Sequence, residues 1–247
     1  MENRIIGRNP VSEAIKSGRE IDKIIVKKGE YEGSLIALVK KAKSLKIPVV
    51  EADRAKLDAL SDGGNHQGVI AFAAAHSYAD IRDIVRAAKE KSRNPLIIIL
   101  DKITDPHNFG SILRTANCAG ADGVVISKRG SVGLSEVVAK TSAGAIEYTP
   151  VAKVTNIAET LELLKKEGFW VVGAEAEGES MYEKDLTGPI ALVIGSEGDG
   201  ISRLVKQKCD FLVKINMYGE INSLNASVAA GIMMYEIVRQ KENGGVK

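Results

Sequence analysis

The sequence predicts an α/β protein in two parts: a small amino-terminal α/β module and a larger domain built on a mostly parallel sheet. From Leu96 onward, short and fully apolar stretches alternate with stretches of helical periodicity, a pattern typical of parallel strands covered by helices on both faces. Residues 1–76 have shorter elements and hold 13 basic and 10 acidic side chains, a net charge of +3. These shifts predict domains at 1–76 and 95–247, joined by a connector at 77–94.

The amino-terminal module is expected to contain three strands and a helix. Short apolar runs predict strands at 23–28, 48–50 and 68–73, and helical spacing predicts a helix at 34–45. One face of that helix is apolar, and the other carries four lysines: Lys40, Lys41, Lys43 and Lys46. These lysines either contact phosphate groups or are simply solvated, and their pattern alone fits both interpretations.

The larger domain is expected to alternate strands with helices, after a connector that is itself mostly helical and ends at Pro95. Apolar runs predict strands at 96–100, 123–127, 170–174, 190–194 and 211–215. The intervening segments predict helices at 110–119, 135–141, 157–167, 202–208 and 224–240. Asn156 followed by Glu159 favours the start of the third helix, and Gly168 favours its end.

Composition and charge exclude several classes of protein. The net charge of +2 is too small for a whole-molecule field that holds nucleic acid, so any such binding must be local. The longest aliphatic run, Leu96–Leu100, is far shorter than a membrane span, and the polar amino terminus lacks the apolar core of a signal peptide. Cys118 and Cys209 are too few for a disulfide framework, and the three histidines lack metal-ligand spacing. A reducing cytoplasm is the expected location, without a metal site.

Three loops at strand ends are rich in glycine and small polar residues, which is where open α/β sheets build their sites. The first, at 101–116, places Asn108 before a helix and Arg114 one and a half turns later, which by itself fits a helix cap and a surface arginine. The second, at 193–201, sets three glycines around Glu197 and matches neither the dinucleotide fingerprint nor the P-loop. The third, at 215–232, offers Ser223 as a helix N-cap.

Together and in this order, the three loops resemble the motifs of the SpoU (TrmH) branch of the SPOUT class of RNA ribose methyltransferases. The segments GRNPV at 7–11 and GNHQGV at 64–69 are also similar to the amino-terminal module of the RlmB-like subgroup. The resemblance implies an RNA-binding amino-terminal module, a methyltransferase domain whose carboxy-terminal segment forms a trefoil knot, and S-adenosylmethionine as cofactor. It also implies a homodimer. The small-residue face of Ala226, Ala229, Ala230 and Gly231 fits tight helix packing either between subunits or within one chain.

The resemblance assigns roles to eight residues. It implies that Arg114 is the central catalytic residue, that Asn108 orients it, and that three more polar residues surround the acceptor ribose and its phosphate: Glu197, Ser223 and Asn225. It further implies that Gly195, Ile215 and Leu224 hold the cofactor. Because a guanidinium essentially never deprotonates in a protein, we expect Arg114 to act as a clamp, while the substrate phosphate or a water accepts the proton.

The expected reaction is 2′-O-methylation of a ribose in ribosomal RNA, with a guanosine of the large subunit favoured by the RlmB-like architecture. Transfer RNA, or another ribosomal nucleotide such as the adenosine modified by the thiostrepton-resistance relatives, is the alternative substrate. A catalytically silent RNA-binding assembly factor is the alternative from another functional class. The complete set of polar motif residues disfavours that last interpretation.

Overall fold

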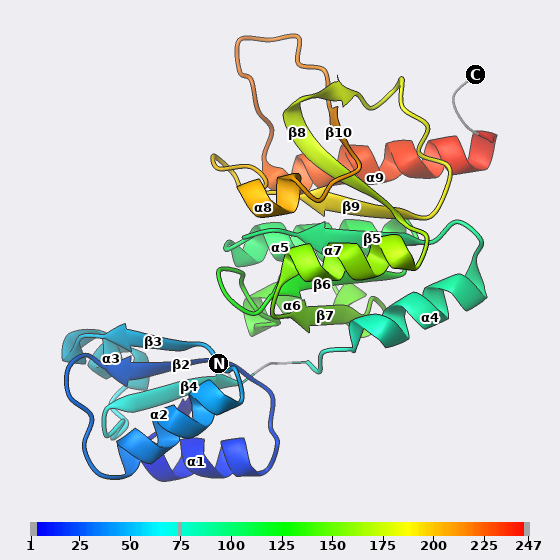
Figure 1. The fold of residues 1–247 in the computed structure, drawn as a ribbon. Helices are drawn as coiled ribbons and strands as arrows, with labels where there is room; N and C mark the ends of the chain where they lie inside the picture. The colour runs from blue at the N-terminus through cyan, green and yellow to red at the C-terminus, as the bar shows by residue number, and fades with distance from the viewer. Residues whose placement is uncertain (1–3, 74–75, 245–247) are drawn as a thin grey trace. The chain divides into compact units, whose positions relative to one another are not determined.

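The computed structural model describes residues 4–73 and 76–244, which cluster into two compact units (Figure 1). The first unit ends at Ser77 and also takes in Gly133–Glu136, and the second holds the remainder of the described chain. The first unit has a four-stranded sheet in the order β1-β4-β2-β3, with strands at Arg4–Ile6 (β1), Ile21–Lys27 (β2), Val49–Ala52 (β3) and Val69–Ala73 (β4). Its helices are α1 (Arg8–Lys16), α2 (Ser34–Ser44) and α3 (Arg54–Ser61).

Both faces of this small sheet are buried. Along β2, Ile24 and Val26 pack with the apolar faces of α1 and α2, whereas Ile25 points to the opposite face and packs with Leu57 of α3. This is the alternation that a strand of period two requires. The apolar face of α2 lies in the core as expected, and its lysines are exposed.

The sequence missed three elements of this unit, namely β1, α1 and α3. β1 has only three residues, so it leaves almost no pattern. α1 contains Pro10, a residue that usually ends helices, but Pro10 lies in the first turn, where its missing N–H leaves no hydrogen bond unmade. α3 spans eight residues and is capped by the Asp53 carboxylate, which accepts from Lys56 N at 2.9 Å.

The second unit is built on a six-stranded parallel sheet in the order β10-β8-β9-β5-β6-β7. Its strands are β5 (Leu96–Leu100), β6 (Gly123–Ser127), β7 (Val151–Val154), β8 (Trp170–Ser180), β9 (Ile190–Ile194) and β10 (Phe211–Lys214). Its helices are α4 (Ile81–Lys91), α5 (Pro106–Cys118), α6 (Glu136–Thr141), which begins at the boundary with the first unit, a 3-10 turn at Ala145–Glu147, α7 (Ile157–Lys166), α8 (Arg203–Lys206) and α9 (Ala226–Asn243). The predicted parallel α/β architecture is confirmed.

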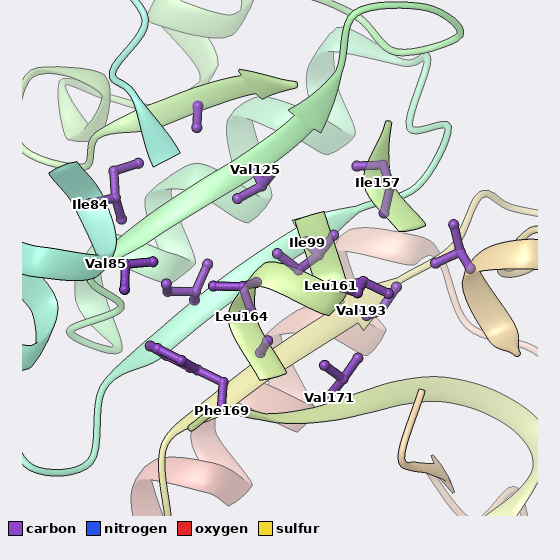
Figure 2. Packing of buried hydrophobic residues seen from close by; sticks show 14 of the residues in the cluster. Ile84, Val85, Ile99, Val125, Ile157, Leu161, Leu164, Phe169, Val171 and Val193 are labelled. Carbon is purple, nitrogen blue, oxygen red and sulfur yellow. The ribbon is translucent and has the colours of Figure 1, made fainter. Parts of the chain in front are cut away.

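Helices cover both faces of the large sheet. On one face, α4, α7 and α8 pack on alternate strand residues around Ile99, Val125 and Val193 (Figure 2). On the other face, α5 and α9 pack against each other and against the sheet. Strand β5 lies between two neighbours with all five residues buried, which explains why it reads as a continuous apolar run. The helix α4 of the predicted connector contributes Ile84 and Val85 to this core.

Among the elements of the second unit that differ from expectation, β8, β7 and α5 have a clear structural reason. β8 continues to Ser180 instead of ending at residue 174, because it pairs with β10 in two separate registers across a polar stretch that carries no strand pattern. β7 was not predicted, since only four residues form it. α5 begins four residues early at Pro106, a favoured first helical position, because the Asp105 carboxylate caps it by accepting from Asn108 N at 2.7 Å.

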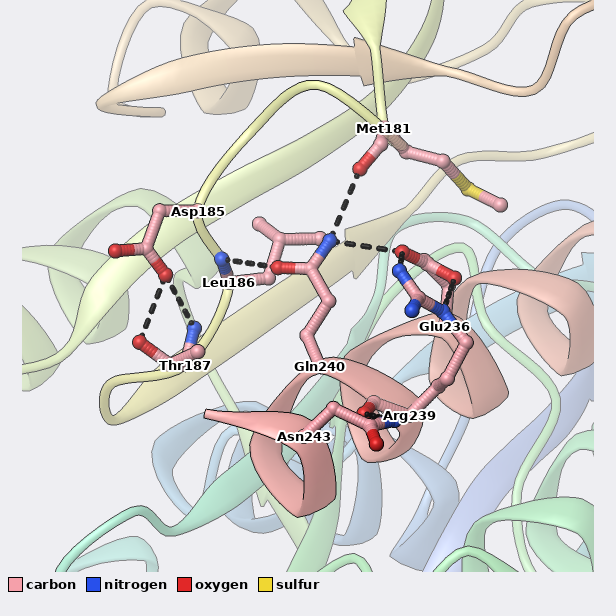
Figure 3. A network of polar contacts seen from close by, with 8 residues as sticks. All are labelled: Met181, Asp185, Leu186, Thr187, Glu236, Arg239, Gln240 and Asn243. Carbon is pink, nitrogen blue, oxygen red and sulfur yellow. Dashed lines mark hydrogen bonds and ion pairs between the residues drawn. The ribbon is translucent and has the colours of Figure 1, made fainter. Parts of the chain in front are cut away.

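A buried polar network holds the carboxy-terminal half of α9 (Figure 3). Gln240 is fully buried: its Oε1 accepts from Leu186 N at 2.8 Å, and its Nε2 donates to Met181 O at 3.3 Å and to Glu236 Oε1 at 2.8 Å. Glu236 in turn accepts two hydrogen bonds from Arg239, which lower the pKa of its carboxyl group. The Gln240 side chain of the last helix therefore holds the segment after β8 by hydrogen bonds to the backbone of that segment.

No helix among residues 4–73 and 76–244 combines the length and apolar character needed to cross a membrane. The same residues hold no group of three or more histidine, cysteine, aspartate or glutamate side chains placed to bind a metal ion.

We predict that Gln240→Leu destabilises the protein by about 1–3 kcal/mol, because it leaves the buried Leu186 N–H without an acceptor. Urea denaturation followed by circular dichroism measures the change. Asn243→Ala is the control: within the described residues its exposed side chain donates only to Arg239 O on the same helix, so the change should stay within about 0.5 kcal/mol. Equal unfolding midpoints for Gln240→Leu and the unaltered protein would contradict the role of the network.

Candidate active site

The loops that follow β5 and β9 begin side by side at the carboxyl edge of the sheet. Leu100 and Ile194 are paired residues of the two parallel strands, and Asp101 N continues the ladder by donating to Ile194 O at 2.9 Å. Neighbouring strands lie about 4.8 Å apart, so side chains of the two loops can touch directly. The sheet thereby brings the first and second motifs together.

A single carboxylate oxygen joins all three motifs. Glu197 Oε1 accepts from Asn108 Nδ2 at 2.8 Å, from Asn225 Nδ2 at 2.5 Å and from Ala226 N at 3.1 Å. Asn225 Nδ2 also donates to Asn108 Oδ1 at 2.9 Å. The structure thus brings together three of the five polar residues proposed from the motifs.

Asn225 is oriented by the helix that it starts. Its Oδ1 accepts from Ser227 N at 3.0 Å and from Val228 N at 3.4 Å, which makes Asn225 the N-cap of α9. The expectation that Ser223 caps this helix is wrong, because α9 begins two residues later than predicted. With its oxygen facing the helix, the Asn225 amide must direct its NH₂ group toward Glu197 and Asn108.

Asn108 is likewise not the cap of its helix. Asp105 takes that position, so Asn108 lies within the first turn of α5 and its side chain is available for the contacts with Glu197 and Asn225. The second oxygen of Glu197, Oε2, accepts no hydrogen bond from any residue in the described chain. This oxygen keeps its capacity to accept a hydrogen bond, and Glu197 lines the adjoining cavity.

Arg114 and Ser223 lie apart from this hydrogen-bonded cluster. Arg114 is exposed on α5 and has neither a hydrogen bond nor an ion pair with any described residue. It follows Asn108 by six residues, which at 3.6 residues per turn places the two side chains roughly 120° apart around the helix axis. Ser223 is exposed and borders the adjoining cavity.

A cavity of about 1070 Å³ opens beside the cluster. All three residues proposed to hold a cofactor, Gly195, Ile215 and Leu224, line it. Glu197 and Asn225 border it as well. Ligand cavities with an apolar wall and a few fixed polar groups are typical binding sites for small molecules.

Glu175, which the sequence did not single out, holds the glycine-rich loop in place. Its side chain is 13% exposed, and its Oε1 accepts a hydrogen bond from Ile201 N at 2.7 Å. Its Oε2 lies 3.2 Å from Lys206 Nζ, and this contact raises the pKa of Lys206. The sequence does carry a signal for Glu175, because this acidic residue directly follows the apolar part of β8, at the same edge of the sheet as the three motifs. Asp101 adds a second support by accepting from Ser202 N at 2.7 Å.

The loop itself is a tight turn that requires glycine. Ser196 and Gly200 exchange backbone hydrogen bonds of 3.1 and 3.0 Å. A Cβ atom at Gly195 would collide with the backbone of Gly200, and Gly200 has a φ of +63°, a left-handed conformation that favours glycine. The glycines therefore shape the loop that presents Glu197.

We predict that Glu175→Ala raises the dissociation constant for S-adenosylmethionine about tenfold, because Ile201 N–H loses its acceptor and the loop loosens. Glu175→Gln keeps an acceptor oxygen and should stay within about threefold of the unaltered protein. Glu177→Ala is the matched control, since Glu177 also pairs with Lys206, at 3.3 Å, but its side chain is 83% exposed and accepts nothing from the loop. Titration calorimetry gives the constants, and a tenfold weakening in the control would overturn the assignment.

Family models match almost the whole chain. Residues 95–235 match the model of the SpoU rRNA Methylase family, and residues 4–79 match the model described as RNA 2′-O ribose methyltransferase substrate binding. These matches confirm that the sequence resembles the SpoU (TrmH) family.

Relatives and a solved structure agree with these matches. A protein from Bacillus subtilis strain 168, named for the TrmH family of tRNA/rRNA methyltransferases, is 49% identical over 98% of this chain and 97% of its own length. A relative of the same family name from Staphylococcus saprophyticus is 50% identical over 98% of both chains. The SpoU methyltransferase AviRb from Streptomyces viridochromogenes, solved in complex with AdoMet, has the same fold at 24% identity, with a TM-score of 0.63 over 98% of this chain and 91% of its own.

The paired family models and the relatives of nearly equal length lead to one conclusion: the chain belongs to the SpoU (TrmH) family of RNA methyltransferases.

Proposed function

We propose that this enzyme transfers a methyl group from S-adenosylmethionine to the 2′-hydroxyl of a ribose in ribosomal RNA, with a guanosine of the large subunit as the acceptor. The hydrogen-bonded cluster of Asn108, Glu197 and Asn225 beside the cavity carries this proposal. It supplies fixed polar groups next to a space that can hold a cofactor. The match of residues 4–79 to a ribose methyltransferase substrate-binding model supports the choice of RNA ribose.

The cavity suits the cofactor in size and chemistry. S-adenosylmethionine combines a flat adenine with an ammonium and a sulfonium cation, and when bound it supplies an electrophilic methyl group. Ile215, Leu224 and Met233 offer an apolar wall for the base. Glu197 places a carboxylate at the same cavity, which favours a ligand with positive charge.

The polar cluster is proposed to orient the acceptor ribose. Glu197 Oε2 can accept a hydrogen bond from a ribose hydroxyl, and the asparagine amides keep that carboxylate in one position. Holding the hydroxyl in line with the methyl donor lowers the entropic part of the barrier. As the new O–C bond forms, the methyl–sulfur bond of the donor would break and leave a neutral thioether, and the hydroxyl proton passes to the substrate phosphate or to a water.

Arg114 is proposed to clamp the phosphate of the acceptor nucleotide. Its guanidinium is exposed and unpaired within the described chain, and planar guanidinium groups bind phosphate in a bidentate manner. Ser223 at the cavity edge completes the proposed contacts to the ribose and its phosphate.

We also propose a homodimer that uses α9. An apolar stripe at helical spacing is exposed on this helix, formed by Val228, Ile232 and Tyr235 with exposed fractions of 48%, 36% and 50%. α9 packs on α5, the helix that carries Arg114, so a dimer built on this helix pair fits a site completed near the subunit contact.

Three further expectations belong to the proposal. We propose that the chain is a member of the RlmB-like subgroup, that its carboxy-terminal segment forms a trefoil knot, and that the protein is located in the cytoplasm.

The first unit is proposed to bind the RNA substrate. Its two family-like segments lie together, since Arg8 Nε donates to Gln67 O at 2.9 Å and Arg8 N donates to Gln67 Oε1 at 3.2 Å. The exposed lysines of α2 add positive charge that can contact phosphates. We propose residues 1–76 as the RNA-binding domain, 77–94 as the connector and 95–247 as the methyltransferase domain.

Transfer RNA is the second candidate substrate, because the relatives' names include both RNA classes. Both RNA classes are tested by incubating the protein with methyl-labelled S-adenosylmethionine and separate RNA pools from cells that lack it. We predict label in large-subunit ribosomal RNA, retained as a 2′-O-methylated nucleotide after nuclease digestion. Label confined to transfer RNA would replace the ribosomal assignment, and absence of label from every pool would favour the silent RNA-binding factor.

We predict that Arg114→Lys lowers kcat at least tenfold while leaving the dissociation constant for S-adenosylmethionine unchanged. Lysine keeps the charge but loses the planar pair of donors that the clamp requires. The side chain is exposed, so the fold should persist. Arg82→Lys, at an exposed arginine of α4, is the control and should keep normal turnover. Normal turnover in Arg114→Lys would show that the bidentate contact is unnecessary.

A further inference from the structure

An aromatic side chain stands almost fully exposed at the edge of the cavity. Tyr218 lies in the loop between β10 and α9, drawn in orange in Figure 1, and is 92% exposed while lining the cavity. Its ring stacks on no aromatic ring and carries no cation within the described residues. The ring therefore contributes little to the stability of the fold, and its position at the cavity makes it available to contact a ligand.

We propose that Tyr218 is a stacking platform for a nucleobase of the RNA substrate, next to the ribose that receives the methyl group. This inference rests on the proposed RNA methylation and adds a residue that contacts the substrate. Bases of unpaired RNA stack on aromatic side chains, and each stacked base contributes substantially to binding.

The size of the cavity leaves room for a nucleotide beside the cofactor. Its volume of about 1070 Å³ lies near the upper limit of the range of roughly 300–1,000 Å³ that is typical for small-molecule sites. The apolar wall at Ile215, Leu224 and the nearly buried Met233 suits the cofactor's base. Tyr218, being exposed, borders the side from which a large substrate enters.

Positive charge on neighbouring loops favours RNA over another partner. Lys102 lies in the loop after β5, and Lys128 and Arg129 lie directly after β6. All three are at the carboxyl edge of the sheet, where the cluster also lies. None of the three forms an ion pair within residues 4–73 and 76–244. Val132 N donates to Ile103 O at 2.9 Å, which ties these two loops together. Basic side chains on one side of the site and an aromatic ring at the cavity fit a polyanion with flat bases.

The proposed orientation of the acceptor nucleotide explains why an aromatic ring is useful at this position. In the proposed arrangement, the acceptor nucleotide leaves regular stacking so that its 2′-hydroxyl reaches the cluster at Glu197. An aromatic ring at the entrance replaces part of the stacking that is lost. Tyr218 would thereby act on RNA affinity and leave the cofactor site unchanged.

The test measures RNA and cofactor binding separately, using an RNA fragment that the unaltered enzyme methylates. We expect Tyr218→Ala to raise KM for this RNA at least tenfold, with the dissociation constant for S-adenosylmethionine unchanged. Tyr218→Phe and Tyr218→Trp keep a stacking face and should remain within about threefold. Ile221→Ala is the matched control, because Ile221 is 76% exposed in the same loop but does not line the cavity.

Several outcomes would overturn the proposal while the unaltered enzyme stays active. Equal losses in the phenylalanine and alanine variants would assign the effect to the hydroxyl group instead of the ring. Weaker S-adenosylmethionine binding in Tyr218→Ala would make Tyr218 a cofactor contact, and a shift to monomer in sedimentation would place it at a subunit interface. Failure of the unaltered enzyme to methylate any RNA would instead refute the proposed function itself.

Discussion

The hydrogen bonds that Glu197 Oε1 accepts are the interaction on which the rest of the site depends. One oxygen receives donors from α5, from the residue that caps α9 and from the first residue of α9. Hydrogen bonds to a charged acceptor are stronger than neutral ones, and a carboxylate at a helix N-terminus also interacts favourably with the helix dipole. The three motifs are therefore joined at one residue, and the second oxygen of Glu197 is held in a defined place.

The parallel sheet makes this convergence possible. β5 lies between β9 and β6, and because all strands run in the same direction, their following loops leave from one edge. Acidic residues at that edge then hold the glycine-rich loop through its backbone: Asp101 after β5 binds Ser202 N, and Glu175 within β8 binds Ile201 N. The polar groups that shape the site are thus supported by strands whose apolar side chains form the core.

The two halves of α9 have different surroundings. Its first turn meets Glu197 and the cavity, whereas its last turns are held by the buried network around Gln240. Along the helix, Val228, Ile232 and Tyr235 leave apolar side chains exposed. One helix thus combines an anchored end, a cavity wall and an exposed apolar stripe.

Local pattern determined which segments are buried strands and helices. β5, β6 and β9 have the bounds that their apolar runs predict, because a strand buried on both faces needs apolar residues throughout. Short or polar elements such as β1, β7 and the end of β8 carry no such requirement, so pairing alone defines them. The resemblance to the family also singled out Gly195, Ile215 and Leu224, which the structure places at the cavity. Only the tertiary structure decided that Asp105 and Asn225 cap the helices, that Glu175 supports the loop, and that Arg114 lies outside the cluster. Caps and supports depend on hydrogen bonds whose partners are set by the packed geometry. Asn108 and Asn225, for example, are 117 positions apart in the sequence and come into contact only when the sheet has formed.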